Sequence, residues 1–252
     1  MPIQFARHLA GATRAQSANR QLGMVLAFVA GAINAGGFLA VHQYTSHMTG
    51  IVSAIADNAV LGRTSAIPLA LAALAAFIAG AACSALMINF ARRRELHSQY
   101  ALPLLLEAVL LLSFGVAGAQ LSERDPLYIP LALTLLCFMM GLQNALITKL
   151  SGAEIRTTHI TGIVTDIGIE LGRMAYWHSG SHAQLPPVRA DRDHLRLLLG
   201  LFGCFTGGAF IGAYGFHAAG YAMTLPLALL LLALASVPMF DDLRSRRPRL
   251  PS

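Results

Sequence analysis

Residues 158–173 read Thr-His-Ile-Thr-Gly-Ile-Val-Thr-Asp-Ile-Gly-Ile-Glu-Leu-Gly-Arg, and the first half of this stretch occurs earlier in the chain in almost the same form. Residues 46–53 read Ser-His-Met-Thr-Gly-Ile-Val-Ser, so each hydroxyl residue, the histidine and the glycine have a counterpart in residues 158–165. An internal repeat decides the architecture before single residues are considered. The chain is therefore predicted to consist of two related halves.

The repeat extends to both sides of these motifs. Gly-Ala-Ile-Asn-Ala at residues 31–35 corresponds to Gly-Leu-Gln-Asn-Ala at residues 141–145. Three further pairs of segments match: residues 61–63 with 171–173, residues 77–80 with 205–208, and residues 103–106 with 226–229. The duplication thus covers most of the chain.

The composition indicates a membrane protein. Of 252 residues, 56% are hydrophobic and 12% are charged, against roughly 25% charged residues in soluble domains. The net charge of +6 comes mostly from arginines outside the apolar runs, so it bears on membrane topology and gives no nucleic-acid footprint. Cys83, Cys137 and Cys204 each lie alone in an apolar segment. They are expected to be free thiols, and neither a metal nor another cofactor is predicted.

Apolar runs long enough to cross the bilayer define the fold. A span needs about 20 helical residues, and six such runs lie near residues 22–42, 66–90, 101–120, 127–148, 195–216 and 221–240. We predict an all-α polytopic membrane protein with six transmembrane helices, three in each half. The predicted units are a basic cytoplasmic arm (1–21), a first membrane repeat (22–122), a second membrane repeat (123–240) and a basic cytoplasmic tail (241–252).

The distribution of basic residues predicts the topology. If residues 46–62 and 158–173 do not cross the membrane, one side receives Arg7, Arg14, Arg20, Arg92, Arg93, Arg94, Lys149, Arg156, Arg244, Arg246, Arg247 and Arg249. Short loops rich in Lys and Arg stay in the cytoplasm, so both termini are expected there. Three spans per half insert the second half upside down. The result is a 3+3 inverted repeat, an arrangement common in transporters, with a short polar helical segment between the first and second helix of each half.

The two polar segments are the candidate binding site. As helices they would begin with a hydroxyl N-cap, Ser46 or Thr158, and the N–H groups of a helix N-terminus attract anions. Gly50 and Gly162 would allow close backbone approach. The candidate substrate-binding residues are Asn34, Ser46, His47, Thr49, Gly50, Asn144, Thr158, His159, Thr161, Gly162 and Asp166.

Other interpretations fit the same residues. The segments would also suit helices lying flat at the interface or helix-packing contacts. The histidines fit a proton relay, ligand binding or a structural hydrogen bond, and the two asparagines fit either bonding between helices or lining of the site.

Several acidic residues stand in apolar surroundings. Asp166 and Glu170 share a helical face, and Arg173 follows three residues later, so an ion pair between Glu170 and Arg173 is predicted. This leaves Asp166 as the functional candidate. Glu107 either extends toward Arg92–Arg94 or acts as a titrating group.

Small residues at helical spacing predict close helix packing. Gly203, Gly207, Gly208 and Gly212 form two overlapping GxxxG patterns, and Ala76, Gly80 and Ser84 form a similar face. Such faces join helices within one chain or between chains. A homo-oligomer is a possible partner, besides the lipid bilayer.

The motifs at residues 46–50, 141–145 and 156–162 resemble those of the YoaK-like family of bacterial membrane proteins, the domain of unknown function 1275. The resemblance covers residues 22–240 and implies about six spans, without a settled activity. It implies a multi-pass protein of the bacterial inner membrane. One departure is Ile51, which stands where that family commonly has asparagine.

Two functions are compatible with these observations. The first is a small secondary transporter or channel for a small polar or anionic solute, since helix N-termini and Arg63, Arg156 and Arg173 favour anions. The alternative is a non-transporting membrane scaffold or accessory subunit that acts through helix–helix contacts. An enzyme is not expected, because no HExxH, GxSxG, P-loop or GxGxxG motif occurs in a suitable context.

Overall fold

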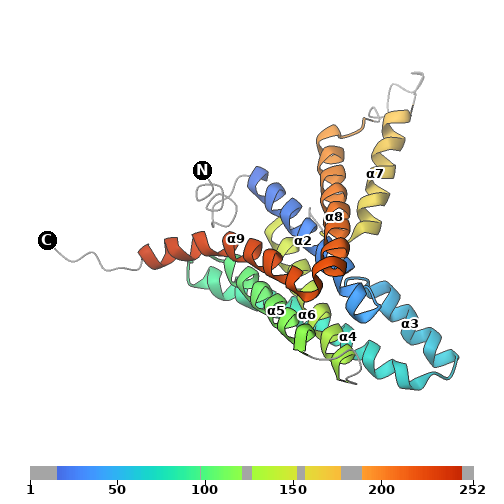
Figure 1. Ribbon diagram of the computed structural model, residues 1–252. Coiled ribbons are helices and arrows are strands. Elements are labelled where there is room, and N and C mark those ends of the chain that lie inside the picture. Colours follow the sequence, from blue (N-terminus) through green and yellow to red (C-terminus); the bar gives the residue numbers. More distant parts are fainter. Residues whose placement is uncertain (1–15, 97, 121–126, 152–156, 177–188, 246–252) are drawn as a thin grey trace.

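The computed structural model describes residues 16–96, 98–120, 127–151, 157–176 and 189–245, and these residues are helical with short connections (Figure 1). The long helices are α2 (Gln16–Val41), α4 (Ile67–Arg93), α5 (Ala101–Gln120), α6 (Tyr128–Ser151), α8 (Arg192–Ala219) and α9 (Thr224–Ser245). The short ones are α3 (Met48–Val60), α7 (Ile160–Ala175) and the 3-10 turns η1 (Thr64–Ala66) and η2 (Gly220–Met223). Each predicted apolar run and both polar segments therefore lie in helices.

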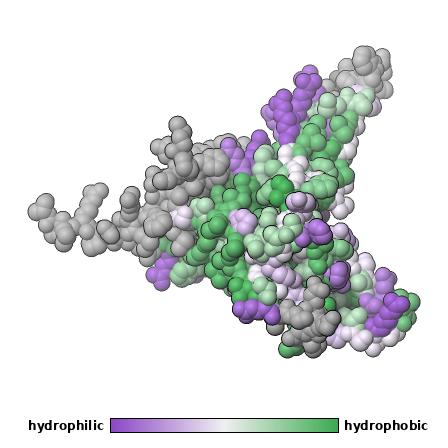
Figure 2. All heavy atoms as spheres, in the orientation of Figure 1, coloured by the Kyte–Doolittle hydropathy of each residue, from purple (hydrophilic) through white to green (hydrophobic). Residues whose placement is uncertain are grey.

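Five helical stretches of the described chain are long and apolar enough to cross a membrane: Asn19–Val41, Thr64–Arg93, Ala101–Gln120, Tyr128–Ser151 and Arg192–Ser236. The last stretch contains α8, η2 and much of α9. A chain with this many apolar helices is a membrane-type protein. In Figure 2, hydrophilic residues gather at the start of α8 and at the turn between α3 and α4, and hydrophobic surface lies between them.

The long helices pack in three main pairs: α2 with α8, α4 with α6, and α5 with α9. In the sequence repeat, α2 corresponds to α6 and α4 to α8. The first two pairs are thus equivalent, and each joins one half to the other.

Glycines bring the helices of these pairs together at equivalent positions. A side chain at Gly31 would meet the carbonyl oxygen of Phe205, and one at Gly141 would meet that of Phe77. The reciprocal contacts are Gly208 with the carbonyl of Phe28 and Gly80 with the carbonyl of Phe138. All four positions therefore require glycine, because backbone occupies the space of a Cβ.

Hydrogen bonds fix the direction of α2 relative to α6. Asn19 Nδ2 donates to Leu150 O at 3.3 Å, and Gln143 Nε2 donates to Leu26 O at 3.3 Å. Seven residues forward on α2 thus correspond to seven residues backward on α6, so these two repeat-related helices are antiparallel. By the same test α5 and α9 are antiparallel, because Gly115 lies against Thr224, the first residue of α9, and Gly118, further along α5, lies against Tyr221 in the preceding η2.

The short helices pack beside the second long helix of each half, α3 on α4 and α7 on α8. These two hairpins project in different directions (Figure 1). Their apolar side chains are widely exposed, as at Val60 (87%), Leu61 (63%) and Leu171 (52%). The hairpins therefore present apolar surface that a lipid environment would cover.

The two GxxxG patterns of α8 serve different surfaces. Gly208 and Gly212 lie against the carbonyls of Phe28 and Ala32 on α2, whereas nothing lies within 4 Å of a Cβ placed at Gly203 or Gly207. Within the described part of the chain, only Gly208 and Gly212 are used for packing.

Alanine at Gly208 is expected to destabilise the fold, and alanine at the adjacent Gly207 provides a matched control. The new Cβ at Gly208 would meet Phe28 backbone, whereas the same change at Gly207 meets open space. Overpacking of this kind costs about 1–3 kcal/mol. Thermal unfolding in detergent should give a lower midpoint for Gly208→Ala than for Gly207→Ala. Equal midpoints would contradict the close crossing of α2 and α8.

Candidate functional site

Asn34 binds the segment that leads into α3. Its Oδ1 accepts hydrogen bonds from Ser46 N–H at 3.3 Å and from Ser46 Oγ at 3.0 Å. We call Asn34, Thr45, Ser46 and His47 the Asn34 unit. This unit joins the last part of α2 to the first residue before α3.

The second half contains an equivalent group. Asn144 Oδ1 accepts a hydrogen bond from Thr158 Oγ1 at 2.6 Å. Asn144, Thr157, Thr158 and His159 form the Asn144 unit. Each predicted asparagine is therefore brought together with the predicted hydroxyl residue of its own half.

These bonds turn the chain back alongside the preceding helix. Asn34 lies seven residues before the end of α2 at Val41, and Asn144 lies seven residues before the end of α6 at Ser151. Seven helical residues span about 10 Å. The short helices thus begin about 10 Å inside the ends of the long helices.

The N-caps differ from the sequence prediction. The N-cap residues are His47 and His159, without a side-chain capping bond, and not Ser46 and Thr158. The hydroxyls of Ser46 and Thr158 donate instead to the asparagines, which directs these side chains toward α2 and α6 and away from the first turns of α3 and α7. The first backbone bond inside α3 is from Ile51 N to His47 O. The N–H groups of residues 48–50 therefore have no partner within the helix.

The repeated spacing of histidine and glycine has a steric basis in each copy. A Cβ at Gly50 would overlap the ring of His47, and a Cβ at Gly162 would overlap the ring of His159. Glycine thus leaves room for the imidazole beside the first helical turn. Both histidines are exposed, as are Thr49 and Thr161 in the first turns of α3 and α7.

Two buried threonines were not predicted as site residues. Thr45 and Thr157 are 0% exposed, and neither hydroxyl has a hydrogen-bond partner among the described residues. They precede Ser46 and Thr158 directly, so extending the repeat by one residue would have found them. A buried hydroxyl without a partner requires an explanation, such as a ligand or an ordered water.

The two units do not meet at one point. From the antiparallel pairing of α2 with α6, Asn34 lies level with residue 135, nine residues from Asn144. This separation is about 13 Å along the helices. The structure therefore contains two separate groups, one in each half.

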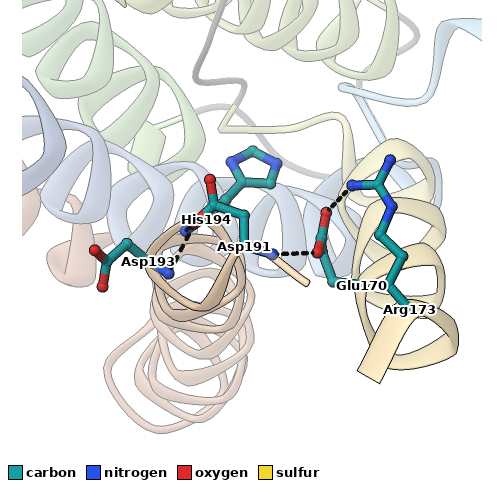
Figure 3. A network of polar contacts seen from close by, with 5 residues as sticks. All are labelled: Glu170, Arg173, Asp191, Asp193 and His194. Carbon is teal, nitrogen blue, oxygen red and sulfur yellow. Dashed lines mark hydrogen bonds and ion pairs between the residues drawn. The ribbon is translucent and has the colours of Figure 1, made fainter. Parts of the chain in front are cut away.

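Asp166 lines a different cavity, of about 300 Å³, between α7 and the start of α8. Its other lining residues are Ile169, Glu170, Arg173, Asp191 and His194. Glu170 is buried, and its Oε1 pairs with Arg173 Nη1 at 2.6 Å, which confirms the predicted ion pair. Its Oε2 accepts a hydrogen bond from Asp191 N–H at 2.8 Å (Figure 3). Glu170 thus fastens α7 to the start of α8.

Asp191 caps α8. Its Oδ1 accepts hydrogen bonds from the N–H groups of Asp193 and His194, both at 3.0 Å. The His194 N–H is the main reason why the pKa of the Asp191 carboxyl lies below its ordinary value of 3.8. The carboxylate form therefore favours the folded cap.

The remaining predicted anion-binding arginines do not gather at either unit. Arg63 is exposed at the turn before η1, and Arg173 is committed to Glu170. Arg156 lies outside the described residues. Within the described ranges, no group of three His, Cys, Asp or Glu side chains is placed to hold a metal ion.

Long apolar helices that enclose polar groups define a polytopic helical protein of membrane type. The chain belongs to the family described as "Protein of unknown function (DUF1275)", whose model matches residues 22–237. The predicted family is therefore confirmed. No curated protein and no solved structure matches the chain.

The bond between Asn144 and Thr158 is expected to couple the two residues energetically. In a double-mutant cycle of Asn144→Ala with Thr158→Val, the changes in unfolding free energy should be non-additive, by about 0.6 kcal/mol and at most about 1.7 kcal/mol. Asn144→Ala with Thr165→Val is the control, because Thr165 Oγ1 bonds Thr161 O in its own helix. Additivity in both cycles would rule out the bond.

The cap at Asp191 predicts a pH-dependent stability. A depressed pKa stabilises the fold above the ordinary value of 3.8, and this contribution is lost as the pH falls below it. At pH 7, Asp191→Ala should lower the thermal midpoint more than Asp193→Ala, whose exposed carboxylate bonds only Arg196 in the described chain. The difference should shrink at pH 3. A difference that is the same at both pH values would exclude an ionised cap.

Proposed function

We propose that the protein is a small secondary transporter or channel for a small polar or anionic solute. The observation that carries this proposal is the position of the two helix N-termini. The bonds of Asn34 to Ser46 and of Asn144 to Thr158 start α3 and α7 about 10 Å back from the ends of α2 and α6. Helix ends at membrane depth are tolerated where they line a cavity or bind a solute.

The chemistry of both units favours an anion. Each offers unpaired N–H groups in a first helical turn, and neither α3 nor α7 has an acidic residue in that turn. The buried hydroxyls of Thr45 and Thr157 add donors that lack a partner within the described chain. Backbone N–H groups and hydroxyls together form an anion-binding environment.

The proposed architecture is six spans in a 3+3 inverted repeat. The antiparallel directions of α2 with α6 and of α5 with α9 support it, because repeat-related helices must oppose each other in such a fold. The first helix of each half packs on the second helix of the other half, α2 on α8 and α6 on α4, as a two-fold axis between the halves requires. An odd number of spans per half places this axis in the membrane plane.

The proposed location is the bacterial inner membrane with both termini cytoplasmic. Arg92 and Arg93 end α4, and Lys149 lies in the last turn of α6. Parallel packing of α4 and α6 brings these ends together, since Lys149 Nζ donates to Asn89 Oδ1 at 2.9 Å. Basic residues on one side agree with a cytoplasmic face.

The two units suit two binding positions in series. Because they lie about 13 Å apart along the helices, and because inversion relates them, one is nearer each face of the membrane. A homo-oligomer through GxxxG contacts would have to use Gly203 and Gly207, since Gly208 and Gly212 are already covered by α2.

The test combines sidedness with solute protection. On a background with Cys83, Cys137 and Cys204 replaced by alanine, Thr49→Cys and Thr161→Cys place thiols at equivalent exposed positions in the first turns of α3 and α7. A membrane-impermeant thiol reagent should label them from opposite faces of the membrane. Small inorganic and carboxylate anions should slow both reactions, and the same anions should enter proteoliposomes.

Each result has a distinct meaning. Labelling of both thiols from one face would contradict the inverted repeat. Opposite labelling without anion protection or uptake would refute transport and favour the scaffold. Ser53→Cys and Thr165→Cys, one turn further along each helix, are the matched controls, and anions should protect these positions less.

A further inference from the structure

Glu107 on α5 is a buried carboxyl without a partner. The residue is 0% exposed, and neither Oε1 nor Oε2 has a hydrogen-bond partner among the described residues. It does not reach Arg92, Arg93 or Arg94, all of which are exposed. An ionised carboxylate in such surroundings would be very costly, so the site requires a proton or a cation.

Two other buried oxygens lack partners in the neighbouring helices. Ser84 Oγ on α4 and Gln143 Oε1 on α6 are both in 0% exposed side chains without a partner for these atoms in the described chain. The contacts of Gly80 with Phe138 and of Asn89 with Lys149 place Ser84 level with Gln143. The helix that carries Glu107, α5, packs against both α4 and α6, whereas Gln143 points to α2 through its bond to Leu26 O.

The depth of Glu107 follows from the end of α5. Tyr221 lies against Gly118 on α5, and its hydroxyl contacts that of Tyr128 on α6. Glu107 stands eleven residues before Gly118, so it lies level with the residue eleven places after Tyr128, which is Met139. Met139 lies between residue 135, which is level with Asn34, and Asn144, so Glu107 is placed between the two units.

No basic group faces Glu107 from the described helices around it. The titratable or basic residues on α4, α6, α8 and η2 are Cys83, Arg92, Arg93, Tyr128, Cys137, Lys149, Arg192, Asp193, His194, Arg196, Cys204, Tyr214, His217 and Tyr221. Arg92, Arg93, Lys149 and the basic residues of α8 stand near helix ends, and α9 has no titratable residue from Thr224 to Phe240. Within the helices that the structure describes, Glu107 therefore has no counter-charge at its own depth.

The repeat shows that the fold does not need these polar groups. Leu230 corresponds to Glu107, Ile33 to Gln143, and Gly212 to Ser84. In each case the equivalent apolar position of the opposite half packs without a carboxyl, amide or hydroxyl. Glu107 and Ser84 belong to the first half and Gln143 to the second, so each unpaired polar group occurs in one copy only, which is a feature beyond packing.

We propose that Glu107 forms the proton-binding site of the protein. The carboxylate takes up one proton to become a neutral carboxylic acid, and release restores the carboxylate. The acid gains an O–H donor that the carboxylate lacks. The coupling of this proton to transport rests on the proposed function: a proton bound between the two units accompanies an anion across the membrane.

The protonation state is measured first, independently of transport. Infrared difference spectra of the reconstituted full chain, recorded during a pH titration, should contain a carboxylic-acid band at neutral pH that is lost in Glu107→Gln. Glu170→Gln is the control, because Glu170 is paired with Arg173 and its loss should leave the band of Glu107 unchanged. A neutral-pH spectrum in which Glu107→Gln removes a carboxylate band instead would overturn the proton site.

Coupling is measured in proteoliposomes with the anions used above. An inward proton gradient should accelerate anion uptake by the wild-type chain, and Glu107→Gln should lose this acceleration while keeping anion protection of the thiol at position 49. Glu107→Leu, which copies Leu230, should behave like Glu107→Gln and shows that folding is retained. Gradient-driven uptake that persists in both variants would refute coupling by Glu107. Absence of any uptake with an intact acid band would refute only the transport proposal.

Discussion

The close crossing of α2 with α8, and of α6 with α4, is the contact on which the other features depend. Lipid tails are as apolar as leucine, so helices in a membrane associate through close packing and not through the hydrophobic effect. Glycines at 31, 80, 141 and 208 let backbone meet backbone. Each crossing joins one half to the other, so neither half completes its packing alone. The crossings also set the levels of Asn34 and Asn144 within the bundle.

The positions of Asn34 and Asn144 along α2 and α6 determine the depth at which α3 and α7 begin. Unpaired N–H groups at the start of α3 and α7 are costly in hydrocarbon, where each needs a partner. The asparagines could not serve them, because they already bind Ser46 and Thr158. The buried hydroxyls of Thr45 and Thr157 lie in the same units and are also unsatisfied. Two helix starts and two hydroxyls thus keep unused hydrogen-bonding capacity, which the proposed solute or water would satisfy.

The sequence predicted the helices and much of their chemistry, because those features depend on local patterns. Apolar length predicted the long helices, and spacing predicted the pair of Glu170 with Arg173. The cap at His47 was missed because the hydroxyl of Ser46 is bound by Asn34, twelve residues away. The separation of the two units and the different use of the α8 glycines depend on the register between helices. One sequence with a repeat does not define that register. The candidate residues were found, but not their division into two groups.

Differences between the halves carry the remaining functional information. A duplicated fold can keep equivalent backbone positions while single side chains diverge, and packing alone favours apolar residues inside the membrane. Each half contains one such unit, the Asn34 unit or the Asn144 unit. The pair therefore suits a step that occurs on both sides of the membrane, such as solute binding. Glu107, Gln143 and Ser84 have only apolar counterparts. The carboxyl of Glu107 occurs once and lies at a depth between the Asn34 and Asn144 units. It therefore suits a step that serves both units, and the binding of a single proton is the simplest chemistry for such a step.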